Sequence, residues 1–216
     1  MSTAPDHVPA DEAREVNRFW FGPTPLGAHT VRDRQSLWFG RASGTPQQAA
    51  IDQMIHERFG ALMQRAADGS LAAWAASPHR RLALILLLDQ LPRNAYRGTA
   101  RAFATDAPAL ELALSGIQAA ADAALSPLER LFLCVPLQHA ERLDVQEESV
   151  AAFRRLLEEA PSELRPFFAD ARVSAERHHA IIRRFGRFPH RNAALGRADT
   201  PEEAEYLIDP TERFGQ

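Results

Sequence analysis

Apolar residues recur along this chain at the three- and four-residue spacing of amphipathic helices, as at Ile51, Ile55, Phe59 and Leu62. No stretch shows the strict alternation of apolar and polar residues that is typical of a strand. The pattern therefore predicts an all-α protein with eight or nine helices. Their expected ranges are 11–20, 30–39, 46–67, 78–91, 107–123, 127–138, 145–160, 163–185 and 201–207.

Three of these helices are expected to begin with the same local signal, a hydroxyl residue followed by proline and then by glutamine or glutamate, at Thr45, Ser126 and Thr200. Short loops join most of the helices, which makes neighbouring helices antiparallel. We therefore expect antiparallel hairpins that stack as a right-handed or irregular array, although no 34-residue repeat consensus is visible. They form a single domain over residues 1–216, in which residues 1–10 are a mobile tail.

Two short aromatic groups lie near the N-terminus, Phe19-Trp20-Phe21 and Trp38-Phe39, and each precedes a glycine. Aromatic side chains bury large areas, so these groups are expected to hold the first two helices against the rest of the fold. Stacking against a ligand is the alternative role for them.

Composition and charge indicate whether the chain folds, binds nucleic acid, crosses a membrane or is secreted. Apolar residues make up 45% of the chain and charged residues 25%, which is typical of a folded domain. The net charge of −3 argues against a nucleic-acid partner, and the longest apolar run, Leu82–Leu88, is too short to cross a membrane. The first fifteen residues are polar, unlike a secretory signal, and the single cysteine, Cys134, lies in an apolar run. We therefore expect a cytoplasmic protein without disulfides.

The string Arg-Asn-Ala-x-x-Gly occurs twice, at 93–98 and at 191–196, each time just after a proline that follows an apolar helix. Proline cannot continue a helix without losing a hydrogen bond, so Pro92 and Pro189 are expected to end their helices and leave carbonyls that arginine and asparagine satisfy. If the two copies meet in space, they form a functional site. The alternative is that both strings only close helix ends, with the asparagine in a strained turn conformation and the glycine allowing the chain to leave the helix.

Three polar clusters follow apolar helices. In the first, Asp89 and Gln90 directly follow the apolar run, and Arg93 and Arg97 are the nearest partners for the carboxylate. This cluster is either an ion-pair network at a helix end or an anion-binding pocket, which Asn94 would help to form.

The second cluster contains His139 and Glu141, with Gln146 one turn into the next helix. His139 and Glu141 can face the same way only if the helix has already ended, because residues two apart lie on nearly opposite helix faces. His139 is either an acid–base group or a helix-end histidine that bonds a carbonyl.

In the third cluster, His178 lies in the middle of the apolar stripe of its helix, whereas His179 lies at its margin. His178 is therefore expected to point inward, and a satisfied core histidine is the common outcome for such a residue. A polar run follows and contains Arg187, His190, Arg191 and Asn192. Three separate segments that bring His, Arg, Asn or acid to the end of an apolar helix favour a common site.

The words Leu-Leu-Asp-Gln-Leu-Pro-Arg-Asn (87–94), Pro-Leu-Gln-His-Ala-Glu (136–141) and Phe-Gly-Arg-Phe-Pro-His-Arg-Asn (185–192) resemble the bacterial family called domain of unknown function 924. The resemblance spans nearly the whole chain. It implies an all-helical fold related to tetratricopeptide stacks and no established activity. The residues that match the family pattern are Asp89, Gln90, Arg93, Asn94, Arg97, His139, Glu141, Gln146, His178, Arg187, His190, Arg191 and Asn192.

Two functions are compatible with this pattern. In the first, the protein binds or converts a small anionic metabolite, and we expect no cofactor and no metal because tight metal-ligand spacings are absent. The residues that would hold and orient the anion are Arg93, Arg97, Arg187, Arg191, Asn94 and Asn192, together with Asp89, Gln90 and Gln146. The catalytic acid–base groups would be His139, Glu141, His178 and His190. In the second, the protein is a helical scaffold for a protein partner, and the polar clusters only brace helix ends.

Overall fold

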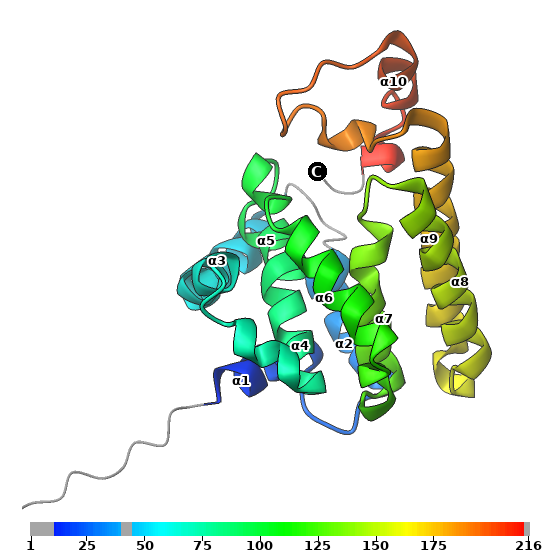
Figure 1. The fold of residues 1–216 in the computed structure, drawn as a ribbon. Helices are drawn as coiled ribbons and strands as arrows, with labels where there is room; N and C mark the ends of the chain where they lie inside the picture. The colour runs from blue at the N-terminus through cyan, green and yellow to red at the C-terminus, as the bar shows by residue number, and fades with distance from the viewer. Residues whose placement is uncertain (1–10, 40–44, 214–216) are drawn as a thin grey trace, which may run out of the picture.

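The computed structural model describes residues 11–39 and 45–213, in which all regular elements are helical (Figure 1). The α-helical segments are α1 (Glu12–Phe21), α2 (Ala28–Phe39), α3 (Pro46–Ala67), α4 (Pro78–Ile85), α5 (Leu91–Ala95), α6 (Asp106–Gln118), α7 (Pro127–Gln138), α8 (Leu143–Glu159), α9 (Arg165–Phe185) and α10 (Pro201–Tyr206). In this described part, α4, a π-helical segment and α5 are continuous, so these ten segments form nine helices. The all-α prediction is therefore confirmed. The expected mobile tail, residues 1–10, lies outside the described residues.

The predicted helix starts are confirmed at all three sites. The Thr45 hydroxyl accepts a hydrogen bond from the backbone N–H of Gln48 at 3.3 Å. At Ser126 and Thr200 the reciprocal capping box forms, in which the glutamate three residues later accepts from the cap's own N–H. Each of these helices therefore begins where the local sequence satisfies its first free N–H groups.

The helix that carries the first polar cluster does not end at Pro92, contrary to the sequence prediction. A π-helical segment (Leu86–Gln90) precedes α5, and the Leu91 N–H donates to Leu86 O, five residues back. The wider turn lets the chain pass the proline and continue as α5 to Ala95. The π segment also places Asp89 and Gln90 inside the protein, where both are buried.

Pro92 lacks the N–H that would otherwise bond the carbonyl of Leu88. In the fold that carbonyl accepts a hydrogen bond from the Thr105 hydroxyl. The next carbonyl, of Asp89, accepts from Arg93 Nη1 at 2.8 Å. The expected arginine donor is therefore present, although the helix continues.

Replacing Thr105 by valine is expected to lower the free energy of unfolding by about 1–3 kcal/mol, because the isosteric change leaves the buried Leu88 carbonyl without its donor. Urea unfolding followed by circular dichroism measures the change. Thr99→Val is the matched control, because the Thr99 hydroxyl bonds the Tyr96 carbonyl at an exposed position. Equal stability of the Thr105 variant and the wild type would contradict the role given to this hydrogen bond.

The second proline also does not end its helix. Gly186, with φ at 69°, terminates α9 in the left-handed conformation, three residues before Pro189. Pro189 instead opens a 3-10 turn, Pro189–Arg191, which carries His190 and Arg191. Glycine ends the helix here because it has no Cβ to oppose a positive φ.

Consecutive long helices pack side by side, with the largest contact between α8 and α9 and the next between α7 and α8 (Figure 1). The order is not strictly sequential, because α1 packs on α4 and α3 on α5. This arrangement is compatible with a tetratricopeptide-like array. A small second apolar cluster, Ile181, Ile182 and Phe188, lies apart from the main core.

The aromatic groups of the first two helices pack as expected. Trp20 and Phe21 of α1 and Trp38 of α2 all meet Phe132 of α7, with ring centres 4.8–5.6 Å apart. Cys134 of α7 is buried, and burial raises the pKa of its thiol to about 12. These contacts hold α1 and α2 against the body of the fold.

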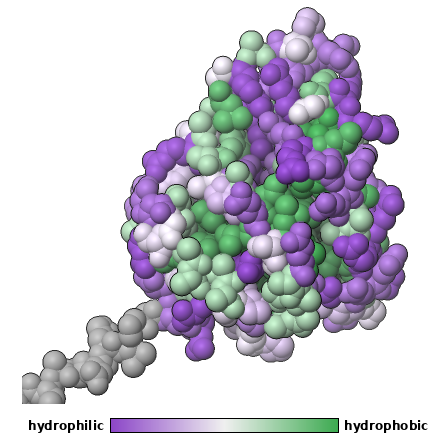
Figure 2. All heavy atoms as spheres, in the orientation of Figure 1, coloured by the Kyte–Doolittle hydropathy of each residue, from purple (hydrophilic) through white to green (hydrophobic). Residues whose placement is uncertain are grey.

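Figure 2 shows hydrophilic residues over the edges of the face seen in Figure 1 and hydrophobic residues toward its middle. Within residues 11–39 and 45–213, no helix combines the length and the apolar composition that are needed to span a membrane.

Candidate functional site

A cavity of about 190 Å³ lies where the C-terminal ends of α2, α5 and α7 meet α9 and the Pro189–Arg191 turn. All three polar clusters reach it, although they are up to about a hundred residues apart in the chain. Of the thirteen residues singled out in the sequence, eight line it: Gln90, Arg93, Asn94, Arg97, His139, His178, His190 and Arg191. Asp89 lies behind this lining and contacts it through His139 and Arg93.

Asp89 and His139 form a buried pair. His139 Nδ1 lies 2.7 Å from Asp89 Oδ1, and Gln90 Nε2 donates to Asp89 Oδ2. Burial alone would raise the pKa of Asp89, but Arg93 and His139 hold it well below its ordinary value. The ionised carboxylate can only accept, so His139 donates from Nδ1 and keeps the lone pair on Nε2.

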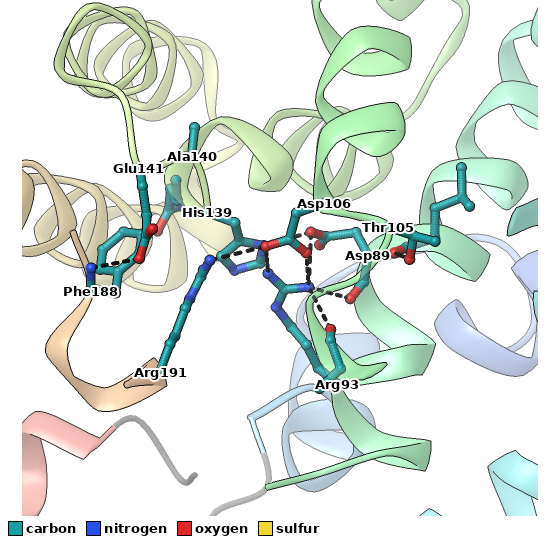
Figure 3. A network of polar contacts seen from close by, with 12 residues as sticks. Asp89, Arg93, Thr105, Asp106, His139, Ala140, Glu141, Phe188 and Arg191 are labelled. Carbon is teal, nitrogen blue, oxygen red and sulfur yellow. Dashed lines mark hydrogen bonds and ion pairs between the residues drawn. The ribbon is translucent and has the colours of Figure 1, made fainter. Parts of the chain in front are cut away.

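The carboxylate that joins the two arginines of the repeated string is Asp106, which is not among the site residues expected from the sequence. Arg93 donates to both of its oxygens at 2.8 and 2.9 Å, and Arg191 donates to Oδ2 at 3.0 Å. Figure 3 shows both side chains reaching Asp106, from α5 and from the 3-10 turn. The first turn of α6 was the available signal, since a helix start favours an acidic residue that arginines can approach.

The two copies of the repeated string therefore meet only in part. Its two arginines meet at Asp106, whereas its two asparagines do not meet: Asn94 contacts Leu37 and Arg97, and Asn192 contacts residues of its own loop. Neither asparagine takes the expected strained turn, because Asn94 lies within α5 and Asn192 has helical φ and ψ. Both glycines have positive φ, 73° at Gly98 and 66° at Gly196, and permit the exits as expected.

Arg97 does not pair with Asp89, contrary to one sequence interpretation. Its Nε donates to Asp52 of α3 at 2.9 Å, and its Nη2 donates to Asn94 Oδ1 at 2.8 Å. Asp52 also accepts from Gln48. Arg97 pairs with Asp52 because α3 packs on α5 and presents Asp52 to the side of α5 on which Arg97 lies.

The Arg191 guanidinium lies between two aromatic rings, 4.5 Å from the centre of Phe188 and 4.8 Å from that of Phe103. The residue is only 5% exposed, and its Nε is buried with no hydrogen-bond partner among the described residues. Burial first, and then the nearby Arg93, lower the pKa of Arg191 to about 10. The positive charge of Arg191 is therefore only partly compensated within the fold.

Three histidines border the cavity. Burial lowers the pKa of His178 to about 3 and that of His190 to about 2, and it also lowers the pKa of His139. All three imidazoles are consequently neutral at neutral pH. His178 points inward as predicted and donates from Nδ1 to the Ser174 carbonyl at 2.8 Å, while His179 lies at the margin. In the described part of the chain no group of three His, Cys, Asp or Glu side chains is arranged to hold a metal ion.

Besides Asp89, four of the singled-out residues lie outside the cavity lining and stabilise the segments that form it. Glu141 accepts from the Phe188 N–H and from Arg197, and Gln146 donates to three carbonyls at the end of α7. Arg187 forms a paired contact with Glu203, and Asn192 donates to Asp199 and Glu203. The α7 helix has ended at Gln138, so His139 and Glu141 are free of the helical constraint, yet they point to different partners.

An apolar side of the cavity was not among the sequence-based site residues. Trp38 and Phe39 of α2 and Phe167 of α9 line it, together with Phe132 and Phe153. Gln138 and Ser174 join the polar side, where the Ser174 hydroxyl donates to Gln138 Oε1 at 3.2 Å. The aromatic group at the end of α2 was a visible signal, for which ligand stacking was the less favoured alternative.

The comparisons with known proteins agree with the sequence resemblance. The model of the family DUF924, bacterial protein of unknown function, matches residues 16–211. The chain belongs to the DUF924 family. A solved structure of a protein of unknown function from Agrobacterium tumefaciens is 35% identical, covers 91% of this chain and 96% of its own, and superposes with a TM-score of 0.72. None of the curated proteins compared with the chain matches it.

Proposed function

We propose that this DUF924 protein binds a small anionic molecule in the cavity, with Arg191 as the main contact for the anionic group. The observation that carries the proposal is the state of Arg191. Among the described residues, its buried guanidinium has one side-chain hydrogen bond, to Asp106, and its Nε has no partner. Buried charged groups are normally paired and fully hydrogen-bonded. A carboxylate or phosphate that enters the cavity would add an acceptor for the guanidinium group of Arg191, which lines it.

The charges around the cavity support an anion rather than a cation. Arg93 and Arg191 face the carboxylates Asp89 and Asp106, but Asp106 accepts two hydrogen bonds from Arg93 and one from Arg191. Arg191 therefore forms fewer hydrogen bonds to Asp106 than Arg93 does. The neighbouring His178 and His190 are neutral at neutral pH. The single N–H of His178 donates to the Ser174 carbonyl, so its Nε2 is an acceptor and gives no hydrogen bond to an anion.

We assign the acid–base role at this site to His139. Asp89 holds its Nδ1–H, which leaves Nε2 as the basic nitrogen of a residue that lines the cavity. A carboxylate that orients a histidine in this way also stabilises the imidazolium form. His178 and His190 border the same space, while Glu141, Gln146, Arg187 and Asn192 act by holding the turn and helix ends in place.

The scaffold alternative draws its support from those same four residues, which brace helix ends as that interpretation requires. It does not account for the partly compensated charge of Arg191 inside a cavity. Thermal unfolding separates the two functions. A small anion at a hundred times its Kd stabilises the folded state by about 2.7 kcal/mol, whereas a scaffold would respond only to a protein partner.

Replacing Arg191 by lysine is expected to abolish stabilisation by small carboxylates and by inorganic phosphate, because an ammonium group cannot reproduce a forked contact at this position. The measurement is the unfolding temperature of each protein with and without acetate, benzoate and phosphate. Arg184→Lys is the matched control, since Arg184 pairs with Glu202 on the surface of α9. An unchanged anion response in the Arg191 variant would remove Arg191 from the site.

A further inference from the structure

The cavity has two chemically different sides. Arginine, histidine and amide side chains form one side, and a connected group of aromatic rings forms the other. Within that group, Trp38 lies 5.8 Å from Phe167 and 4.8 Å from Phe132, and Phe39 lies 6.1 Å from Phe167, measured between ring centres. A free phosphate or a short dicarboxylate would leave the aromatic side without a partner.

The volume of the cavity shows what size of ring it can hold. At about 190 Å³ the cavity is somewhat larger than the roughly 150 Å³ that holds one benzene molecule in a well-studied apolar cavity. One six-membered ring with a single small substituent fits that space. Binding sites of this kind obtain most of their affinity from apolar surface and their orientation from a few polar groups.

Resting on the proposed anion-binding function, we propose that the ligand is a small aromatic carboxylate, with its ring against Trp38 and Phe167 and its carboxylate at Arg191. Aromatic rings favour tilted and edge-to-face neighbours, and the ring planes of Trp38 and Phe167 meet at 40°. Phe103 also lines the cavity, with its ring centre 4.8 Å from the Arg191 guanidinium, so apolar surface continues up to the charged end.

Titration of the purified chain with benzoate tests this inference. Trp38 lines the cavity, whereas the other two tryptophans, Trp20 and Trp74, do not, so a bound ring should change the fluorescence of Trp38. We expect benzoate to bind at least tenfold more tightly than acetate, inorganic phosphate, benzamide or cyclohexanecarboxylate. The Trp38→Phe variant should lose the fluorescence change and retain the stabilisation by benzoate in thermal unfolding.

Two substitutions on α9 provide a matched pair. Phe167→Ala should weaken benzoate binding about tenfold and leave acetate unaffected, because only the ring contact is lost. Phe185→Ala removes the same group from the same helix outside the cavity lining, where Phe185 packs on Tyr206, and should leave benzoate binding unchanged.

The outcomes separate this inference from the proposed function. Tighter binding of phosphate or acetate than of benzoate would overturn the aromatic class and keep the anion site. Equal binding of cyclohexanecarboxylate would also overturn the aromatic class, leaving an apolar acid as the ligand. Equal binding of benzamide, or no binding of any probe, would overturn both proposals.

Discussion

Replacing Asp106 by asparagine is expected to lower the free energy of unfolding by about 3 kcal/mol, because it leaves two inward-facing guanidinium groups without their shared carboxylate. The side chains of Arg93 and Arg191 are 14% and 7% exposed, so water can compensate little of the lost charge. Asparagine keeps the shape and one acceptor oxygen, which isolates the effect of charge. Urea unfolding at neutral pH, followed by circular dichroism, measures the difference.

Two further variants make the Asp106 result interpretable. Glu12→Gln removes a carboxylate from an exposed pair with Arg65 and should leave the unfolding midpoint almost unchanged. Adding Arg191→Met to Asp106→Asn should recover part of the lost stability, because the uncompensated charge is then replaced by an apolar side chain. If the double variant is no more stable than Asp106→Asn, the loss does not come from an uncompensated Arg191.

Acidification from pH 7.5 to pH 5 is expected to cost the wild type about 2 kcal/mol more than it costs a His178→Gln variant. The pKa of His178 is about 3 in the folded protein, below the ordinary value of 6.5 that applies after unfolding. The unfolded chain therefore binds more protons between these two values. The contribution of His178 is fully present above pH 6.5 and is lost as the pH falls toward 3.

Urea unfolding at half-unit steps of pH measures this difference. Glutamine is the suitable replacement because its amide retains a donor for the Ser174 carbonyl, which His178 Nδ1 bonds in the wild type. The stability curves of the two proteins should run parallel above pH 7.5, where the imidazole stays neutral in both states. Equal losses down to pH 5 would show that His178 accepts its proton while the protein is folded.

Much of the polar lining of the cavity could be predicted from the sequence, because its residues stand at the ends of apolar helices. His178 was predicted to point inward from its place in the stripe of α9, and it is buried. The π segment was not predicted, since Pro92 was expected to stop the helix, and a proline can be accommodated only when other groups satisfy the carbonyls it leaves. Thr105 and Arg93 do so, and Thr105 lies in a different element.

Local sequence was enough to define the helices and their starts, because caps and the apolar period depend on residues within a turn or two of each other. Which charged groups meet was decided only in three dimensions. Asp106 lies 13 residues from Arg93 and 85 from Arg191, and any of 28 acidic residues was a possible partner. Helix packing selected Asp106, just as it selected Asp52 for Arg97 and brought Trp38 and Phe167 to one side of the cavity. Side chains far apart in sequence pair only where packing brings their elements within hydrogen-bond distance, and the helical period does not contain that information.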